Sequence, residues 1–177
     1  MISGPIAAGK STLAVAVGEL LRSQRRTVAR TDLDTVAEMA LPTLPDWEWA
    51  HRIHADVVGA WLRTGIELVV DEGTSTPEEV RQVLAAAPPD CGVFHVVLTA
   101  DYAASLARAQ GDPGRGLSRD PDFLRRHHDA YAAVVDQLPC DLRIHVEGRS
   151  PEALAAQVVA TFGRHRPGAR GEVTVLD

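Results

Sequence analysis

Hydrophobic and polar positions follow two different periods along the chain. Apolar residues recur every three or four positions over residues 11–22 and 46–63, which predicts amphipathic helices. Short, compact apolar runs predict buried strands at residues 1–3, 27–31, 66–70, 92–98 and 141–146, and further helices are predicted at residues 101–109 and 122–136. This alternation favours an α/β fold with a mostly parallel sheet.

Three predicted helices begin with the same capping pattern, a capping residue followed by proline and an acidic residue. The clearest begins at Thr76-Pro77, where Glu79 completes a capping box. The other two begin at Asp120-Pro121 and Ser150-Pro151. The acidic residues place negative charge at the positive ends of the helix dipoles.

One helical stripe in residues 46–63 contains two of the three tryptophans. Trp47, His51, His54, Val58 and Trp61 recur at helical spacing. Such a stripe is expected to face the core first, and to form the wall of a substrate pocket second. The two histidines lack a third ligand at a recognisable spacing, so no metal site is predicted there.

Length and charge bound the class of protein. A chain of 177 residues predicts one domain, residues 1–162, followed by a Gly-, Arg- and Pro-rich mobile tail, residues 163–177. The net charge of −6 repels phosphate backbones, so nucleic acid is not the expected partner. No apolar run has the length of a membrane span and no secretory signal is recognised, while two cysteines, Cys91 and Cys140, fit a reducing cytoplasm. Oligomeric state is not predicted.

One motif carries specific chemistry. The stretch from Gly4 to Ser11, GPIAAGKS, matches G-x-x-x-x-G-K-[ST] between a strand stub and a helix. Its glycines let backbone N–H groups turn around a polyphosphate, and the following helix adds its positive dipole end. Lys10, the only lysine of the chain, can reach the β- and γ-phosphates, and the Ser11 hydroxyl can ligate Mg²⁺. The predicted nucleotide-binding residues are Gly4, Pro5, Ile6, Ala7, Ala8, Gly9, Lys10, Ser11 and Thr12.

Two carboxylate positions follow predicted strands, where ligands bind in open α/β sheets. Asp32 can act as general base for an attacking hydroxyl, or alternatively can cap a helix. Asp34 is expected to be a cap or a surface charge. Asp71 and Glu72 follow residues 66–70, where a carboxylate can contact the acceptor or hold Mg²⁺ through water; for the metal we expect Asp71. Glu72 can instead polarise a hydrolytic water, and plain solvation of the strand end is the further alternative.

Arginines cluster around the Gly-rich residues 111–119. A mobile loop lets an arginine close over bound nucleotide and neutralise the charge of phosphoryl transfer. Arg115 and Arg119 lie within this loop and are the expected catalytic arginines, and Arg108 and Arg115 are expected to contact the nucleotide. The other members of the cluster are Arg125 and Arg126, and any single member can be an ordinary surface charge.

Taken together, the phosphate loop, Asp32, the stretch 70–79 (VDEGTSTPEE) and the arginine-bearing lid resemble the small P-loop kinases. That group includes polynucleotide 5′-kinase domains, shikimate and gluconate kinases, and chloramphenicol phosphotransferase-like proteins. The resemblance covers about residues 1–162. It implies a three-layer α/β fold with a five-stranded parallel sheet in the order 2-3-1-4-5, helices on both faces and an Arg-bearing lid. It also implies that Asp32 is the base, that Arg115 and Arg119 are lid residues, and that residues 148–151 lie near the adenine. The Asp71-Glu72 pair departs from the more usual Asp-x-Asn run.

The function predicted on these grounds is an ATP- and Mg²⁺-dependent kinase that phosphorylates a hydroxyl of a small molecule. By resemblance alone, that molecule is an antibiotic or a metabolite. Its expected contacts are Asp32, Trp47, Asp71 and Glu72. A polynucleotide 5′-hydroxyl kinase is the alternative within the enzyme class. An ATPase or nucleotide-dependent switch acting on a protein partner is the alternative from another class.

Overall fold

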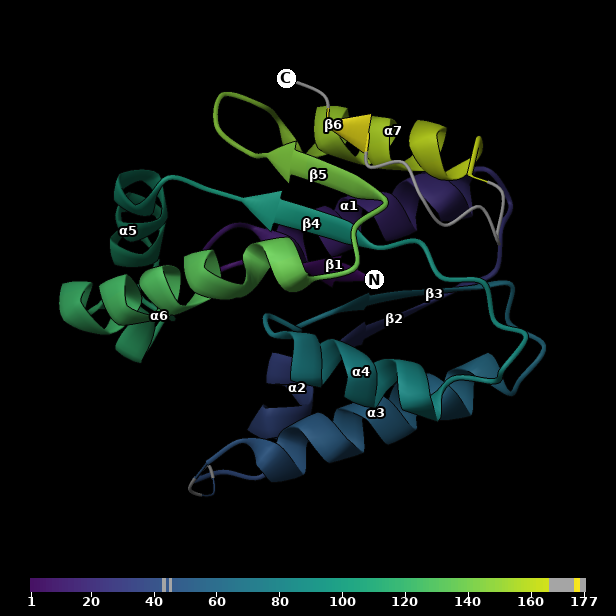
Figure 1. Ribbon diagram of the computed structural model, residues 1–177, viewed down its shortest axis with the longest axis horizontal. Helices are drawn as coiled ribbons and strands as arrows, with labels where there is room; N and C mark the ends of the chain where they lie inside the picture. The colour runs from purple at the N-terminus through teal and green to yellow at the C-terminus, as the bar shows by residue number, and fades with distance from the viewer. Residues whose placement is uncertain (43, 45, 166–173, 176–177) are drawn as a thin grey trace.

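Parallel strands form the centre of the molecule, and helices cover both faces of the sheet (Figure 1). The computed structural model describes residues 1–42, 44, 46–165 and 174–175. The strand order is β2-β3-β1-β4-β5-β6, so the predicted order of the first five strands is confirmed. The strands are β1 (Ile2–Ser3), β2 (Val28–Asp32), β3 (Leu68–Glu72), β4 (Val96–Thr99), β5 (Leu142–His145) and the unpredicted edge strand β6 (Thr174–Val175).

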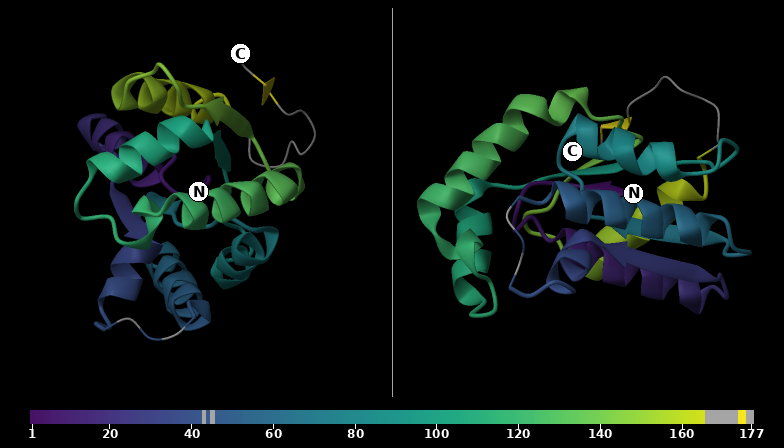
Figure 2. Two further views of the ribbon diagram at one scale, coloured as in Figure 1. Left: turned by 90° about the vertical axis from the view of Figure 1, so that its left-hand side faces the viewer. Right: turned by 90° about the horizontal axis from the view of Figure 1, so that it is seen from below.

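The helices divide between the two faces of the sheet. Helices α1 (Lys10–Ser23) and α7 (Pro151–Phe162) cover one face. Helices α3 (Glu48–Leu62), α4 (Pro77–Ala86) and α6 (Pro121–Val134) cover the other. Figure 2 shows that α5 (Tyr102–Gly111) and α6 stand beside the sheet, with the short helix α2 (Leu33–Glu38) below them in the left-hand view. Two 3₁₀ turns complete the fold, η1 (Leu117–Arg119) and η2 (Val135–Gln137).

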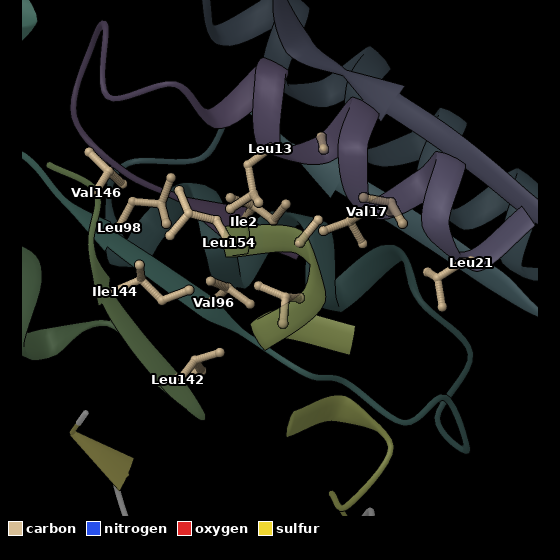
Figure 3. Close-up of a cluster of buried hydrophobic side chains, with 14 of the residues drawn as sticks. Ile2, Leu13, Val17, Leu21, Val96, Leu98, Leu142, Ile144, Val146 and Leu154 are labelled. Carbon is tan, nitrogen blue, oxygen red and sulfur yellow. The ribbon is translucent and has the colours of Figure 1, made fainter. Parts of the chain in front are cut away.

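The main core lies between the sheet and the α1–α7 pair (Figure 3). Alternate residues of a strand point to opposite faces, so each strand sends every second side chain into this layer. The buried members include Ile2, Leu13, Val17, Leu21, Val96, Leu98, Leu142, Ile144, Val146 and Leu154. A second cluster on the opposite face joins β4 to α4 and α6 through Val97, Val80 and Tyr131. These layers fix the carboxyl ends of the strands on a rigid base.

The central strand β1 is only two residues long and lies within the predicted strand stub of residues 1–3. Ile2 pairs with both Glu72 of β3 and Val96 of β4. The next side chain, Ser3, is fully buried and its hydroxyl lies 2.7 Å from Thr74 Oγ1 and 2.7 Å from His95 Nε2. Burial lowers the pKa of His95 to about 3, so this ring is neutral. Side-chain hydrogen bonds therefore add to the few backbone bonds that hold the start of the phosphate loop.

Strand β3 ends later than its apolar pattern indicates. We predicted residues 66–70, whereas the strand runs from Leu68 to Glu72. Thr31 pairs with Asp71 and Asp32 pairs with Glu72, so both acidic residues belong to the sheet. The hydrophobic pattern excludes Asp71 and Glu72 because carboxylates are rarely buried in a strand unless other side chains pair with them.

The predicted caps are present. Thr76 Oγ1 accepts a hydrogen bond from Glu79 N at 3.2 Å, and Glu79 Oε2 accepts one from Thr76 N at 3.1 Å, which makes a complete capping box. Asp120 and Ser150 likewise cap α6 and α7. None of the helices in the described part of the chain combines the length and apolarity that a membrane span needs.

The predicted domain boundary at residue 162 coincides with the end of α7. Of the predicted tail, residues 166–173 and 176–177 lie outside the described residues. The division into a domain and a tail therefore stays a prediction.

Gly73 is the position where the backbone least tolerates a side chain. Its φ is +128°, and an added Cβ would lie 2.4 Å from Leu33 Cβ. We expect Gly73→Ala to lower the free energy of unfolding by about 2–4 kcal/mol, because it combines a strained φ with overpacking. Chemical denaturation measures this change. Gly18→Ala is the control, since Gly18 lies inside α1 with nothing within 4 Å of an added Cβ, and it should be neutral or stabilising. Equal stability of the two variants would contradict the packing described here.

Candidate active site

The phosphate loop joins β1 to α1 and turns through two left-handed residues. Ala7 has a φ of 61° and Gly9 has a φ of 88°. Gly9 is the N-cap of α1 and provides no side-chain cap. The first N–H groups of a helix have no partner within the helix, so those of Lys10, Ser11 and Thr12 are available to an anion.

Two side chains hold the first carbonyls of this loop. Lys10 Nζ donates to Gly4 O at 3.1 Å and to Pro5 O at 3.2 Å. Ser75 Oγ, from the segment that follows β3, donates to Gly4 O at 3.2 Å. These bonds turn the first peptide groups of the loop toward Lys10 and Ser75.

Helices α5 and α6 hold the next two carbonyls. Arg108 Nε of α5 donates to Ala7 O at 2.9 Å. His128 Nε2 of α6 lies 3.0 Å from Ile6 O, and a carbonyl oxygen requires the ring nitrogen to be the donor. Burial lowers the pKa of His128, while its bond to Ile6 opposes that change. We call these two contacts the outer clamp of the phosphate loop.

Glu72 lies beside the phosphate loop, at the end of β3. Its side chain is 2% exposed, and its Oε1 has no hydrogen-bond partner among the described residues. Burial raises the pKa of Glu72 to about 7, although Lys10 and Ser11 oppose this shift. Burial also lowers the pKa of Lys10, and the charges of Glu72 and Asp34 oppose that change. Glu72 and Lys10, whose charged forms have opposite signs, are therefore buried next to each other.

Asp32 and Asp34 lie around the start of α2. Asp32 Oδ1 accepts a hydrogen bond from Thr35 N at 3.1 Å, so the capping alternative for Asp32 is present in the structure. A carboxylate has a second oxygen, so this cap leaves Asp32 an acceptor atom for chemistry. Asp34 reaches solvent, yet partial desolvation raises its pKa, with Lys10 opposing and Asp32 adding to the rise. Asp34 is exposed, as expected of a surface charge, and lies near enough to Lys10 for the two charges to act on each other.

Asp71 occupies a different environment from its neighbour Glu72. Its Oδ1 accepts a hydrogen bond from Thr31 Oγ1 at 2.8 Å and lies 2.9 Å from His54 Nε2 of α3, a contact that is close but not aligned as a hydrogen bond. Alternation along β3 turns Asp71 to the face covered by α3. This corrects the expectation that Asp71 contacts the acceptor and holds Mg²⁺ through water; Glu72 is the residue placed beside Ser11.

The arginines expected in the lid differ in their surroundings. Arg115 acts electrostatically on both Lys10 and Asp34, and its Nε lies 3.4 Å from Asp112 Oδ2. Arg119 ends η1 with an exposed side chain. Arg125 instead stacks on the Tyr102 ring, with Cζ 3.3 Å from the ring centre, and joins α6 to α5. Of the predicted catalytic arginines, Arg115 is thus the one the structure brings to the loop.

The predicted stripe of α3 is buried only in its middle. His54 and Val58 are buried, whereas Trp47 and Trp61, at the two ends of the helix, are exposed. The core-facing interpretation of both tryptophans is therefore wrong. Ala50 and Ala55 of the same helix take part in the core instead.

His128 is the functional residue that the sequence analysis missed. From the sequence alone, the adjacent His127 and His128 are typical of a polar helix face, yet His128 is buried and its ring nitrogen bonds to the loop. Its spacing from the buried Leu124 and Tyr131 was the available signal, because positions i, i+4 and i+7 share one helix face. Ser75 carried no comparable signal.

A cavity of about 360 Å³ lies at the opposite, amino-terminal ends of the strands. Its walls include Leu21, Leu62, Phe94 and Phe162. The phosphate loop does not line it, so the site described above is separate from this cavity.

Comparisons with known proteins agree with the geometry. No family model matches the sequence, and no curated protein matches it. Among solved structures, a gluconokinase from Sinorhizobium meliloti 1021 has a TM-score of 0.61 at 14% identity, over 92% of this chain and 90% of that one. The tunicamycin resistance protein of Deinococcus radiodurans has a TM-score of 0.57 at 17% identity, over 92% and 93%. A sugar kinase from Janibacter sp. HTCC2649 has a TM-score of 0.57 at 17% identity, over 92% of each chain. The chain has the P-loop kinase fold.

Within this fold, the buried carboxyl of Glu72 makes stability depend on pH. In the folded protein the pKa of Glu72 is raised to about 7, so folding favours the protonated carboxyl. The stability that protonated Glu72 contributes to the fold is fully present below its unfolded pKa and is lost as the pH rises through 7. We expect Glu72→Gln to raise the free energy of unfolding at pH 8 by on the order of 1–3 kcal/mol, with no gain near pH 4.

Denaturation of both proteins across this pH range, in nucleotide-free buffer, measures the effect. Glu19→Gln, on the exposed surface of α1, is the control and should follow the wild type at every pH. A Glu72→Gln variant that loses stability at pH 8 would contradict the assigned environment.

Proposed function

We propose that the protein is an ATP- and Mg²⁺-dependent kinase that transfers the γ-phosphoryl group to a hydroxyl of a small molecule. The observation that carries this proposal is the meeting of a phosphate loop with two strand-end carboxylates, Asp32 and Glu72, and the lid residue Arg115. Together these supply an anion cradle, a base and a cation for developing charge.

On the nucleotide side, the N–H groups at the start of α1 bind phosphate oxygens and Lys10 neutralises them. In the structure Lys10 bonds to Gly4 O and Pro5 O, within the loop itself. A bound triphosphate offers Lys10 stronger, charged acceptors than these carbonyls. Arg108 and His128 keep the loop in shape during this exchange, because they bond to its outer carbonyls.

On the acceptor side, Asp32 takes the proton of the attacking hydroxyl. The acceptor oxygen forms a bond to the γ-phosphorus while the bond to the β–γ bridging oxygen breaks, and ADP leaves with that electron pair. The proton passes to Asp32 and then to solvent. Arg115 moves with its loop over the phosphates and offsets the charge of the transferring group.

The side chains around Ser11 also fit a magnesium ion. Glu72 Oε1 is a buried carboxylate oxygen with no hydrogen-bond partner in the part of the chain that the structure describes. It lies close to the Ser11 hydroxyl, and oxygen ligands suit Mg²⁺. Ser11 and Glu72 would hold the ion, which neutralises phosphate charge when bound.

The comparisons add support for this class of reaction. Two of the similar structures are named as a gluconokinase and a sugar kinase, and the third as a tunicamycin resistance protein. A polynucleotide acceptor is disfavoured by the net charge of −6.

One observation favours a second function, ATP hydrolysis. Glu72 is buried beside Lys10 with a pKa near 7, which suits a base that polarises water. In that case ATP turnover would depend on Glu72 and would yield free phosphate with every acceptor.

The decisive variant for the kinase proposal is Asp32→Asn. Asparagine caps a helix as well as aspartate does, so α2 should persist, while the base is removed. We expect acceptor-dependent ADP formation to fall by about 10²–10⁴, with binding of MgATP largely kept. Lys10→Ala should instead abolish nucleotide binding in titration calorimetry. Full activity of Asp32→Asn would exclude it as the base, and nucleotide binding by neither wild type nor variant would end the proposal.

The outer clamp makes a separate prediction. We expect His128→Ala to weaken MgATP binding by roughly tenfold, because the hydrogen bond from its ring to Ile6 O of the phosphate loop is lost. The KM for the acceptor should stay unchanged. His127→Ala is the matched control, since its side chain is exposed on the same helix. Fluorescence titration with a labelled nucleotide compares the three proteins. A rise in acceptor KM without a change in nucleotide binding would remove His128 from the loop-positioning role.

A further inference from the structure

One segment on the acceptor side is acidic. Residues 31–51, which run from the end of β2 through α2 into α3, lie between Arg30 and Arg52 and contain five acidic side chains and no lysine or arginine. The acids are Asp32, Asp34, Glu38, Asp46 and Glu48. The cations nearest the loop belong to the nucleotide side: Lys10, Arg108 and Arg115. An anionic acceptor would therefore meet like charge on its own side of the site.

The same segment exposes large apolar side chains. Met39 is 78% exposed, Leu41 72% and Trp47 41%. At 1.5 Å per helical residue, Met39 lies on the order of 10 Å from Asp32 along α2. These side chains are thus within the length of one small molecule from the proposed base.

The lid contributes an apolar side chain to the opposite rim. Leu117 is 73% exposed and follows Arg115 by two residues, which is at most about 7 Å of chain. Because Arg115 acts on both Asp34 and Lys10, this part of the lid lies across the site from α2. The left-hand view of Figure 2 shows the segment between α5 and α6 above α2, on the same side of the molecule.

Exposed apolar side chains are ordinary when they are single and scattered. Here they gather on two segments at the entrance to a proposed catalytic site, and five acids accompany them. Resting on the proposed function, we infer that the acceptor is an amphiphile: a hydroxyl compound with an apolar body and without an anionic group. Its apolar body contacts Met39, Leu41, Trp47 and Leu117, while its hydroxyl meets Asp32.

Three matched glycosides test separately the need for an apolar body and the exclusion of an anionic group. n-Octyl β-glucoside has an apolar body and no charge, methyl β-glucoside lacks the apolar body, and n-octyl β-glucuronide adds a carboxylate. Titration below the micellar concentration, with MgADP present, should give saturable binding of octyl glucoside. We expect methyl glucoside and octyl glucuronide each to bind at least about tenfold more weakly.

Substitutions then locate the binding. Trp47→Ala and Leu117→Ser should each weaken octyl glucoside binding by roughly fivefold or more, because each removes an apolar contact. Trp61→Ala is the control for Trp47, with 43% exposure at the far end of α3, and Val93→Ser is the control for Leu117, with 37% exposure near the amino ends of the strands. Both controls should bind like the wild type.

Several outcomes would overturn the inference. These are tighter binding of the glucuronide, equal binding of methyl and octyl glucosides, no saturation at all, or equal losses in the control variants. MgATP binding is measured on the same proteins. If ATP binds in a Lys10-dependent manner and the glucoside pattern fails, the kinase proposal stands and the amphiphile inference is lost; if ATP does not bind, both fall.

Discussion

The arrangement of the site depends on which way the peptide groups of the phosphate loop point. A loop that binds anions must turn its N–H groups inward, and a peptide group can do so only if its carbonyl turns outward to a partner. Here Ile6 and Ala7 direct their carbonyls to His128 and Arg108, which come from α6 and α5. The loop conformation is thus held by the helices that carry the lid. Any movement of α5 and α6 on closing over a nucleotide is transmitted to the loop by these two bonds.

The protonation states of Glu72 and Lys10 would respond to a charged ligand bound beside them. Asp32, Asp34 and Glu72 face Lys10 and Arg115, and burial shifts the pKa of both Glu72 and Lys10 toward their neutral forms. A bound triphosphate would favour the charged ammonium of Lys10, and its metal ion would favour the charged carboxylate of Glu72. Under the proposed function, nucleotide binding would therefore be coupled to proton exchange at Glu72. The cost of burying Glu72 and Lys10 would be offset by the charges that arrive with the substrate.

Much of this could be predicted from the sequence, and the failures share a physical cause. The phosphate loop and the capping box of Thr76 and Glu79 follow from local patterns and spacing, whereas the order of the first five strands came from the resemblance to the small P-loop kinases. The failures at Asp71 and Trp47, and the missed role of His128, concern residues whose role is set by what packs against them. Alternation along β3 separates Asp71 from Glu72 by face, and only the position of α3 tells which face meets the loop. His128 reads as polar surface until α6 is placed against Ile6.

The distribution of charge also gives the site a direction. The nucleotide side collects Lys10, Arg108 and Arg115 around the phosphate loop, whereas the acceptor side, residues 31–51, has carboxylates and no basic side chain apart from histidine. A triphosphate placed on the acceptor side would lack cations, and its repulsion by Asp32 and Asp34 selects the loop instead. An acceptor without negative charge is free of this penalty and gains from burying apolar surface against Trp47 and Leu117. Under the proposed function, charge would sort the two substrates before any specific contact is made, and the γ-phosphate would face Asp32, the carboxylate proposed to take the proton.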